Sequence, residues 1–426
     1  MDNAGESKAV NGAVVALNRP NGEYVSGFLG GRGQPRHPSW APDVGPEPVA
    51  ICLEECAVAL LERVLSERPE TPEVVFLPTR AAERYRCMAD LKQAVSADTG
   101  LDVEFAYSLK TNYFNGLIDM AREQDFLVEA ISQLEAQKAI AAGFEAGQII
   151  LNGPAKWWPR MLVSSPVRAV FCDSVEELET LSRRNPRFPV AALTGIRLRA
   201  SSHGSRFGVE VDSQRAVDRV SVALGSRRGV DRFGVHFHMS PASIGAEQWF
   251  DLYEWVLNRA RSLEKSSGAA VVCLDIGGGW SPHAFDVVLA PRLGQLAVAA
   301  MAMLPGLRTL VLEPGRGLAQ PTMALITRVL EVRYLGTELE VVVDASIADV
   351  PEAKAYRHPV HVRGHALGSW SPLGAGDARV LGRSCMESDV IVSAVSVPDW
   401  VAPGDVMVID HVGAYDQSKS YAFGRG

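Results

Sequence analysis

Short apolar runs alternate with segments of helical spacing between residues 100 and 316. The runs are rich in β-branched residues and predict eight strands, at Val103–Thr111, Leu127–Ser132, Ile149–Gly153, Ala169–Ser174, Ala191–Ala200, Phe233–Ser240, Val271–Gly279 and Thr309–Gly315. Segments between them carry apolar residues at i, i+3 and i+4 and predict helices, at Ser132–Gly143, Ser174–Arg184, Ser213–Leu224, Gln248–Leu263 and Arg292–Leu304. Several of these helices begin with a serine, which is a preferred N-cap residue. Eight strand–helix units in about 215 residues favour a closed (β/α)8 barrel, or TIM barrel, over an open α/β sheet.

After Gly317 the pattern changes to strands separated by turns, with few helical segments. It predicts strands at Met323–Tyr334, Leu339–Val343, Pro359–Val362, Val390–Val397 and Val406–Ile409. Turn signals such as Pro403-Gly404-Asp405 recur at intervals typical of a β-sandwich or β-barrel. We therefore expect a separate C-terminal β domain.

These patterns divide the chain into four segments. Residues 1–48 are rich in Gly, Pro, Asn and Ser, which predicts a flexible leader. Residues 49–76 contain most of a helical pattern that runs from Pro48 to Arg68, and we expect this segment to pack on the β domain. The barrel is expected to span residues 77–318 and the β domain residues 319–426.

Composition excludes several classes of function. The 42 basic and 50 acidic residues give a formal net charge of −8, which disfavours nucleic acid as a partner. The longest uncharged stretch, between Arg292 and Arg308, is shorter than the roughly 18 apolar residues of a membrane-spanning helix. The N-terminus shows no secretory signal, and the six cysteines are scattered, so we expect a cytoplasmic protein with reduced thiols and no membrane partner.

Candidate chemistry gathers at the ends of the predicted strands, where barrel enzymes place their working residues. The first strand ends in Tyr107-Ser108-Leu109-Lys110-Thr111-Asn112, with one lysine in an otherwise apolar run. Burial lowers the pKa of an amine and so prepares it to form a Schiff base with an aldehyde. The alternative is a lysine that extends from the strand end into solvent.

Two further strand ends suggest a site for an anion. The seventh strand ends in Asp275-Ile276-Gly277-Gly278-Gly279, whose N–H groups could bind a phosphate, although a tight turn would also explain the glycines. The eighth ends in Glu313-Pro314-Gly315-Arg316, which places an acid and a planar cation at the same rim. A surface ion pair is the alternative for these two charges.

The sixth predicted strand ends in His236-Phe237-His238-Met239-Ser240, and period-two geometry would put both histidines on one face. A pair of metal ligands is one explanation, but no third ligand stands at diagnostic spacing, so we expect no metal. A histidine can equally stack on an aromatic cofactor. Together, the lysine, the glycines, the arginine and the carboxylate predict a pocket for pyridoxal 5'-phosphate.

The sequence resembles the pyridoxal-phosphate-dependent decarboxylases of the alanine-racemase fold (fold type III), which include the diaminopimelate and ornithine decarboxylases. The resemblance runs from about Pro72 to Gly424 and is carried by six motifs in the family's order. They are Tyr107–Asn112, Val235–His238, Leu274–Gly279, Glu313–Arg316, the Cys385 segment and Gly413-Ala414-Tyr415.

The resemblance implies a role for each matched residue. Lys110 would hold the cofactor as a Schiff base, His238 would stack on the pyridine ring, and Glu313 would pair with the ring nitrogen and so keep it an electron acceptor. The phosphate would be bound by Gly277, Gly278, Gly279, Arg316 and Tyr415. Glu129 stands where the family usually has an aspartate near the lysine, and Arg197 matches a strand-five arginine. Cys385 would reach the site of a partner subunit and protonate the intermediate after carbon dioxide leaves, which implies a homodimer with shared active sites.

Three departures from the family pattern affect substrate binding and the phosphate site. The position after the cysteine, usually an acid that meets the distal amine of the substrate, is Met386, with Glu387 one place later. The glycine-serine that usually follows the histidine motif is replaced by Met239-Ser240-Pro241, so Ser240 is the candidate for the phosphate hydroxyl. An arginine-containing run typical of diaminopimelate decarboxylases is missing from Asp344–Tyr356.

These features predict a homodimeric enzyme that removes the α-carboxylate of an amino acid or amino-acid conjugate, giving an amine and carbon dioxide. The altered distal pocket favours the synthesis of a specialised metabolite, such as a siderophore or antibiotic. Three alternatives stay open: a diaminopimelate or ornithine/lysine decarboxylase of primary metabolism, an amino-acid racemase on the same fold, and a catalytically silent homologue that binds a partner protein.

Overall fold

The computed structural model describes residues 53–154, 156, 165–182, 190–225, 231–364 and 368–423. The predicted leader, residues 1–48, lies outside the described residues.

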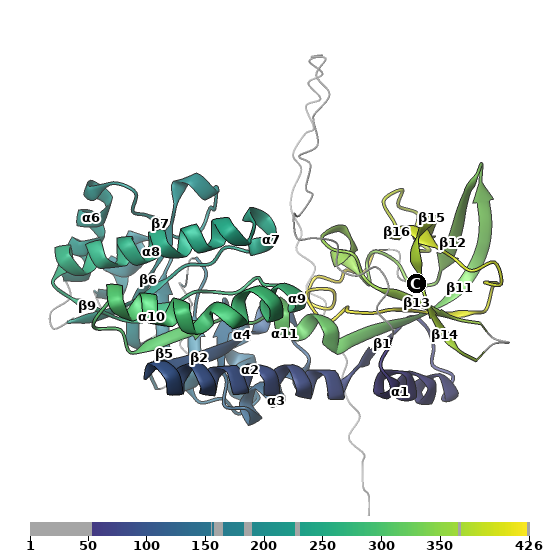
Figure 1. The fold of residues 1–426 in the computed structure, drawn as a ribbon, viewed down its shortest axis with the longest axis horizontal. Helices are drawn as coiled ribbons and strands as arrows, with labels where there is room; N and C mark the ends of the chain where they lie inside the picture. The colour runs from purple at the N-terminus through teal and green to yellow at the C-terminus, as the bar shows by residue number, and fades with distance from the viewer. Residues whose placement is uncertain are drawn as a thin grey trace, which may run out of the picture. The chain divides into compact units, whose positions relative to one another are not determined.

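Eight parallel strands form a closed barrel (Figure 1). Their bounds are β2 Asp102–Ser108, β3 Leu127–Ala130, β4 Ile149–Leu151, β5 Val167–Cys172, β6 Ala191–Arg199, β8 Arg232–His236, β9 Ala270–Asp275 and β10 Thr309–Leu312. They pair in this order and β10 pairs back onto β2, while the two-residue strand β7 (Val209–Glu210) extends β6 at its end. The predicted barrel and all eight of its strands are confirmed, because near-continuous apolar runs are what a parallel sheet covered by helices requires.

Some of these strands end earlier than predicted, and this moves two site residues. β2 ends at Ser108, so Lys110 lies in a 3-10 turn (η1, Leu109–Thr111). β8 ends at His236, so His238 lies beyond the strand and the two histidines do not share a strand face as we expected. The apolar pattern continues past the strand ends because rim residues such as Leu109 and Phe237 are themselves buried.

Helices cover the outside of the barrel. The longer ones are α2 Pro78–Thr99, α3 Asn115–Glu123, α4 Gln133–Ala141, α5 Val175–Ser182, α6 Gln214–Gly225, α8 Ala246–Ser267 and α10 Leu293–Met303, and three shorter ones are α7 Pro241–Ile244, α9 Pro282–Ala284 and α11 Arg316–Ala319. All five predicted helices are present. Predicted serine caps are also confirmed, because the hydroxyls of Ser132, Ser174 and Ser213 accept backbone N–H groups of the first turns of α4, α5 and α6.

One helical run, Pro282–Met303, is long and apolar enough to cross a membrane by length and composition alone. It consists of α9, the π-turn η4 (Phe285–Leu289), the 3-10 turn η5 (Ala290–Arg292) and α10. Within the barrel, α10 packs against α2 and α8, and α8 and α10 run side by side in Figure 1. Phe285, Leu293 and Ala297 are buried in the barrel core. The apolar residues of this run therefore pack against the barrel.

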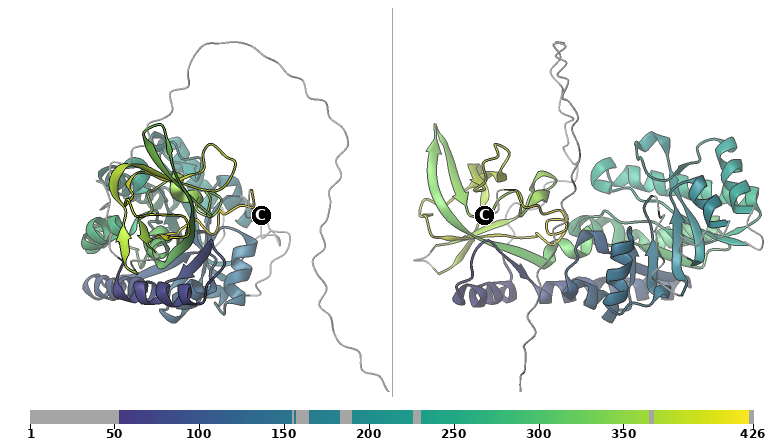
Figure 2. Two further views of the ribbon diagram at one scale, coloured as in Figure 1. Left: turned by 90° about the vertical axis from the view of Figure 1, so that its right-hand side faces the viewer. Right: turned by 180° about the vertical axis from the view of Figure 1, so that it is seen from behind.

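The β domain is built on an eight-stranded sheet. Its strands are β1 Glu73–Phe76, β11 Met323–Leu335, β12 Glu338–Val343, β13 Val360–Arg363, β14 Trp370–Pro372, β15 Gly374–Leu381, β16 Val390–Ser396 and β17 Val406–Ile409. The order is β14-β13-β17-β11-β12-β15-β16, with β1 pairing antiparallel to β11. The separate β domain and its five predicted strands are confirmed. Figure 2 shows the β11–β12 hairpin, in green, extending beyond the rest of the sheet.

The N-terminal helix α1 (Glu55–Ser66) packs on this sheet. Ala57 and Leu61 of α1 share a buried apolar cluster with Ala324, Ile326 and Val408. Since β1 also belongs to the sheet, we propose that residues 49–76 form part of the β domain and that the barrel occupies residues 77–318.

Several polar contacts join the barrel to the β domain. Arg80 of α2 donates to Asp410 at 2.7 Å, and both side chains are buried. The Asn112 amide donates to the carbonyl of Gly413 at 2.8 Å, and the N–H of Tyr415 donates to the carbonyl of Thr111 at 2.9 Å. The segment that follows β17 thus lies against the turn that carries Lys110.

Candidate active site

Lys110 and Glu129 form an ion pair at the carboxyl-end rim of the barrel. The pairing of β2 with β3 sets Ser108 opposite Glu129, two residues before the lysine. Lys110 Nζ lies 2.5 Å from Glu129 Oε2, and the Ser108 hydroxyl donates to the same oxygen at 2.7 Å. Glu129 is buried, while 24% of the lysine side chain is exposed. Two strand ends that sequence analysis selected therefore meet at one pair of atoms.

The pKa of Lys110 differs from our expectation. Burial acts to lower this pKa, but the nearby carboxylates of Glu129 and Glu313 outweigh burial, and the pKa is raised above its ordinary value. The prediction that burial alone lowers the pKa of the lysine is wrong for this state of the protein, because it ignored the charge of the adjacent strand. Lys110 is a protonated amine with a proton acceptor, Glu129 Oε2, in direct contact.

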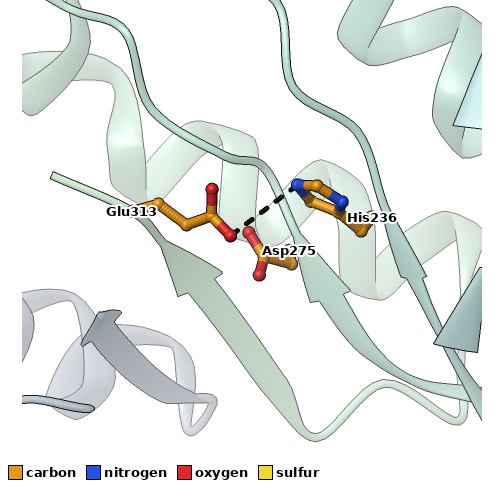
Figure 3. Close-up of side chains that lie close together, drawn as sticks. All are labelled: His236, Asp275 and Glu313. Carbon is orange, nitrogen blue, oxygen red and sulfur yellow. Dashed lines mark ion pairs between the residues drawn. The ribbon is translucent and has the colours of Figure 1, made fainter. Parts of the chain in front are cut away.

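Three buried side chains gather where β8, β9 and β10 end: His236, Asp275 and Glu313 (Figure 3). His236 Nε2 lies 3.7 Å from Glu313 Oε1, and the Asn152 amide donates to that same oxygen. Asp275 Oδ1 accepts the N–H of Gly277 at 2.9 Å. One ligand atom from each of the three lies within 4.8 Å of the others, a spacing that a metal ion could use. Existing hydrogen bonds to both carboxylates compete with such coordination.

Buried acids outnumber the cations around this cluster. Burial raises the pKa of Glu313 well above its ordinary value, and neighbouring Asp275 and Glu129 add to the rise. Burial likewise raises the pKa of Asp275. Among the described residues, these three buried acids face the cations Lys110 and Arg197. Two carboxylate oxygens, Asp275 Oδ2 and Glu129 Oε1, lack hydrogen-bond partners within the part of the chain that the structure describes. A protonated pyridine nitrogen would supply a further positive charge to this cluster of acids.

Arg197 and His238 lie together beside this cluster. Arg197 of β6 donates to the backbone carbonyl of His238 at 3.3 Å and lies 4.0 Å from Asp173, with its guanidinium 5.1 Å from the centre of the Phe207 ring. Burial lowers the pKa of His238 to about 3, and the positive charges of Arg197 and Lys110 contribute. A neutral imidazole at this position is suited to stacking on an aromatic ring.

The glycine turn after β9 allows a close approach of backbone segments. Gly277 and Gly279 have φ values of 65° and 90°, which side chains rarely tolerate. A Cβ at Gly278 would overlap the carbonyl oxygen of Glu313. The hydroxyl of Ser240, the N-cap residue of α7, donates to the Gly279 carbonyl at 3.0 Å. A small pocket beside this turn is lined by the three glycines, by Pro314 and Gly315, and by apolar side chains that include Phe285 and Leu289.

The two remaining candidates for the phosphate, Arg316 and Tyr415, come from the barrel and from the β domain. Arg316 is the first residue of α11, its Nε donates to Gln320 at 2.8 Å, and its guanidinium stacks on the ring of Tyr356 at 4.1 Å. Tyr415 follows β17 with a φ of 67° and is held by the carbonyl of Thr111. Arg316 is thus held against Tyr356 of the β domain, and the Lys110 turn is held against the segment that contains Tyr415.

Cys385, Met386 and Glu387 lie in the loop between β15 and β16. Cys385 and Glu387 are exposed and Met386 is half-buried. Buried Asp389 holds this loop, because its carboxylate accepts N–H groups from Ser384 at 2.8 Å and Ile347 at 2.6 Å. Within the described residues, the hydrogen bonds of the loop run to the β domain and not to Lys110. The structure therefore does not join these three residues to the site of the same chain.

Several site residues were missed by sequence analysis. Asn152 follows β4, Asp275 ends β9, and Thr111 and Tyr356 contact other site residues. Asn152 follows a strand end, so the rule that found Lys110 could have found it, and Asp275 belongs to a strand end that sequence analysis selected without giving this residue a role. Tyr356 had no such signal, because its contacts come from segments far apart in the sequence.

The residues fit pyridoxal phosphate. Lys110 can bind an aldehyde, buried acids can balance a ring nitrogen, neutral His238 can stack, and the glycine turn with Arg316 can bind a phosphate. The buried carboxylate oxygens that lack partners among the described residues are what such a ligand would use. A parallel barrel with this rim, joined to a β domain, defines the class of pyridoxal-phosphate enzymes with the alanine-racemase fold.

Comparison with known proteins identifies the family within this class. The family model described as "Pyridoxal-dependent decarboxylase, pyridoxal binding domain" matches residues 85–320, more than half of the 426-residue chain. The chain belongs to this family and is a pyridoxal-phosphate-dependent amino-acid decarboxylase, a carboxy-lyase. The predicted family, enzyme class and cofactor are confirmed.

Two relatives match most of the chain. The L-glutamyl-[BtrI acyl-carrier protein] decarboxylase of Niallia circulans is 24% identical over 389 residues, covering 84% of this chain and 86% of that protein. The diaminopimelate decarboxylase of Pseudomonas aeruginosa is 25% identical over 369 residues, covering 82% and 84%.

Solved structures show the same fold. Diaminopimelate decarboxylase from Helicobacter pylori, complexed with L-lysine, matches with a TM-score of 0.68 and 21% identity over 85% of this chain and 91% of that one. The arginine decarboxylase of Paramecium bursaria Chlorella virus, bound to agmatine, matches with a TM-score of 0.67 and 18% identity over 86% and 98%.

Proposed function

We propose that this decarboxylase is a cytoplasmic homodimer that acts on an amino acid or amino-acid conjugate during the synthesis of a specialised metabolite. The observation that carries this proposal is Met386, an apolar side chain where the resemblance leads us to expect an acid for the distal amine of a free diamino acid. A relative whose name describes an L-glutamyl group on an acyl-carrier protein supports a conjugated substrate.

Lys110 is the residue that we assign to the cofactor aldehyde. Because Glu129 Oε2 lies 2.5 Å from Lys110 Nζ, the glutamate can accept the ammonium proton and free the amine for reaction. When bound, pyridoxal phosphate supplies the electron acceptor that makes loss of the α-carboxylate feasible. Glu313 would keep the ring nitrogen protonated, and Asn152 fixes the orientation of the Glu313 carboxylate by donating to its Oε1.

The remaining cofactor contacts follow from position and charge. His238 stays neutral at physiological pH and would stack on the ring without competing for its charge. Arg197, which contacts the His238 backbone, would hold that histidine in place. The glycine turn, together with Ser240, Arg316 and Tyr415, would bind the phosphate. Of these, Ser240 is the least direct candidate, because its hydroxyl already donates to Gly279.

Cys385 is our candidate for protonation of the product, acting in the site of a partner subunit. Its exposure within one chain and the hydrogen bonds that hold its loop to the β domain support a role across a subunit boundary. A thiol can donate a proton near neutral pH because its ordinary pKa is about 8.5. Met386 and Glu387 would reach the same neighbouring site and contact the distal part of the substrate.

A second candidate is diaminopimelate decarboxylation in primary metabolism. Several relatives and structural neighbours bear that name, and they favour this alternative. The absence of an arginine between Asp344 and Tyr356 argues against it, because a second carboxylate on the substrate would be well matched by a guanidinium.

Carbon dioxide release from a panel of substrates tests the proposal. The panel contains diaminopimelate, ornithine, lysine and arginine as free amino acids, and L-glutamyl acyl-carrier protein as a conjugate. We expect turnover of the conjugate and little turnover of the free amino acids, with Lys110→Ala inactive and the exposed Lys265→Ala fully active as the matched control. Turnover of a free amino acid at about 10 s⁻¹, a typical enzymatic rate, would contradict the specialised role.

Met386 can be tested directly in the same assay. Replacing it by an acid, in Met386→Asp, should raise turnover of ornithine or lysine at least tenfold, or about 1.4 kcal/mol, by pairing with the distal amine. Ser388→Asp, which adds the same charge at an exposed position in the same loop, is the control for a general change of charge. No gain in Met386→Asp would place the distal amine elsewhere. Optical rotation followed alongside carbon dioxide release distinguishes decarboxylation from racemisation.

A further inference from the structure

Tyr356 connects the two residues that we assign to the cofactor phosphate. It follows the 3-10 turn η7 (Pro351–Lys354) of the β domain. The guanidinium of Arg316, from the barrel, lies 4.1 Å from the centre of its ring. Its hydroxyl donates to the carbonyl of Ala414 at 2.7 Å and lies 3.3 Å from Asp416 Oδ2. Ala414 and Asp416 are the residues on either side of Tyr415.

The contact with Arg316 limits how the guanidinium can turn. Gln320 accepts the Nε–H of Arg316 at 2.8 Å, which uses one of its five N–H donors. The guanidinium carbon lies over the Tyr356 ring, 4.1 Å from its centre, and a cation over an aromatic face is attracted to it. These two contacts restrict the rotation of the guanidinium and leave its Nη groups to meet an anion.

The hydroxyl contacts hold a strained segment. Tyr415 has a φ of 67°, a left-handed conformation that a non-glycine residue adopts only when its surroundings impose it. Its N–H is bound by the carbonyl of Thr111, next to Lys110. Tyr356 contacts both sequence neighbours of Tyr415, so it adds a second constraint on the conformation of that residue.

Tyr356 is itself held in a neutral, fixed state. Its ring packs 4.8 Å from the ring of His358. Burial raises the pKa of the Tyr356 phenol well above its ordinary value, and the nearby acids Asp416 and Glu352 add to the rise, whereas Arg316 acts to lower it. The phenol therefore keeps its proton and remains a hydrogen-bond donor at every pH at which the enzyme would work.

We propose that Tyr356 is a positioning residue that sets Arg316 and Tyr415 in one phosphate-binding site, so that cofactor affinity depends on contact between the barrel and the β domain. This inference rests on the proposed assignment of Arg316 and Tyr415 to the phosphate. Tyr356 acts through its two partners, the ring through Arg316 and the hydroxyl through the backbone around Tyr415.

The test compares two ligands that differ only in the phosphate. Pyridoxal 5'-phosphate and pyridoxal are titrated into full-length cofactor-free enzyme, and the Kd of each is read from the absorbance near 420 nm expected for an imine with lysine. Tyr356→Leu removes both ring and hydroxyl and should weaken pyridoxal phosphate about tenfold. Tyr356→Phe keeps the ring under Arg316 and should weaken it about threefold. Neither variant should change the Kd of pyridoxal.

Tyr253→Phe is the matched control. Tyr253 is buried in α8 and donates to the carbonyl of Leu296 at 2.7 Å, so the variant loses an equivalent hydrogen bond away from the phosphate residues. It should leave both Kd values unchanged. An equal loss of affinity for both ligands in the Tyr356 variants, or no loss for either, would overturn the positioning role.

The experiment also separates this inference from the function on which it rests. If the wild-type absorbance survives in Lys110→Ala, the assignment of Lys110 is wrong, whatever the Tyr356 variants show. If the wild type binds pyridoxal and its phosphate equally well, the phosphate site is wrongly assigned and the inference fails with it. Should Tyr356→Leu not fold, Tyr356→Phe decides alone, because it retains the volume and the cation contact of the ring.

Discussion

Asp416 is a buried acid whose protonation should make the stability of the protein depend on pH in an unusual direction. Its Oδ1 accepts the N–H of Glu352 at 3.0 Å, and its Oδ2 lies 3.3 Å from the Tyr356 hydroxyl and 3.6 Å from His358 Nε2. Burial raises the pKa of Asp416 to about 8, and the charge of Glu352 contributes. Asp416→Asn supplies a permanently neutral donor of the same shape.

The sign and size of the effect follow from the two pKa values. In the unfolded chain Asp416 ionises near pH 3.8, whereas in the folded protein it keeps its proton up to about pH 8. Unfolding therefore releases a proton between these values, so stability is present at low pH and is lost as pH rises, by about 1.4 kcal/mol per pH unit. Asp416→Asn does not titrate. Relative to wild type, its free energy of unfolding should rise by about 2.7 kcal/mol between pH 5.5 and 7.5.

Urea-induced unfolding of both proteins at pH 5.5 and 7.5, with saturating pyridoxal phosphate, measures this difference, and the titration of all other groups cancels in the comparison. Asp410→Asn is the contrasting variant, because Arg80 and His411 hold the pKa of Asp410 below its ordinary value despite burial. A lowered pKa gives stability that is lost only at acidic pH, below the window. Breaking its buried pair with Arg80 should cost about 3–5 kcal/mol. A pH-independent difference between wild type and Asp416→Asn would refute the reasoning.

Three further predictions concern the site itself. Gly278→Ala should abolish the 420 nm absorbance because a Cβ there overlaps the Glu313 backbone, whereas Gly147→Ala, with open space at the Cβ, should leave it unchanged. Lys110→Ala and Cys385→Ala chains should each be inactive alone. If each site uses the cysteine of its partner, mixing the two should recover about a quarter of wild-type carbon dioxide release, because half of the dimers are mixed and one of their two sites is complete. No release should be recovered if each site uses its own cysteine. Glu129→Gln should slow cofactor loading, measured by stopped-flow absorbance, because the amide cannot accept the lysine proton.

Most of the barrel could be predicted because each of its strands is a short apolar run followed by a helical pattern. The elements that escaped prediction had weaker local patterns. Helix α2 carries many charged residues and shows no continuous apolar stripe, although Tyr85 and Met88 on it are buried. Strands β14 and β15 contain Pro372 and Gly374, which normally argue against strands, and they form because neighbouring strands of the sheet supply their partners.

The candidate site could be predicted as far as strand order brings residues together. Parallel strands place all of their carboxyl ends at one rim, so Lys110, Glu129 and Glu313 had to be near one another. Their electrostatics could not be predicted, since the pKa of Lys110 depends on the distance to Glu129, which only the register of β2 and β3 determines. The contacts of Tyr356 were equally inaccessible, because they depend on how the β domain docks on the barrel.

The assignment of site residues implies that cofactor binding and domain contact are coupled. Lys110 comes from the barrel and Tyr415 from the segment after β17, and the bond from the Tyr415 N–H to the Thr111 carbonyl joins the two directly. A ligand that contacts both segments binds only when they are together, so it stabilises their contact by the free energy of its own binding. The formal charge of −8 describes the protein surface as a whole, but the phosphate would meet Arg316 and the glycine turn, where local geometry outweighs net charge. The binding site for this anion is therefore a property of the assembled chain and not of the barrel alone.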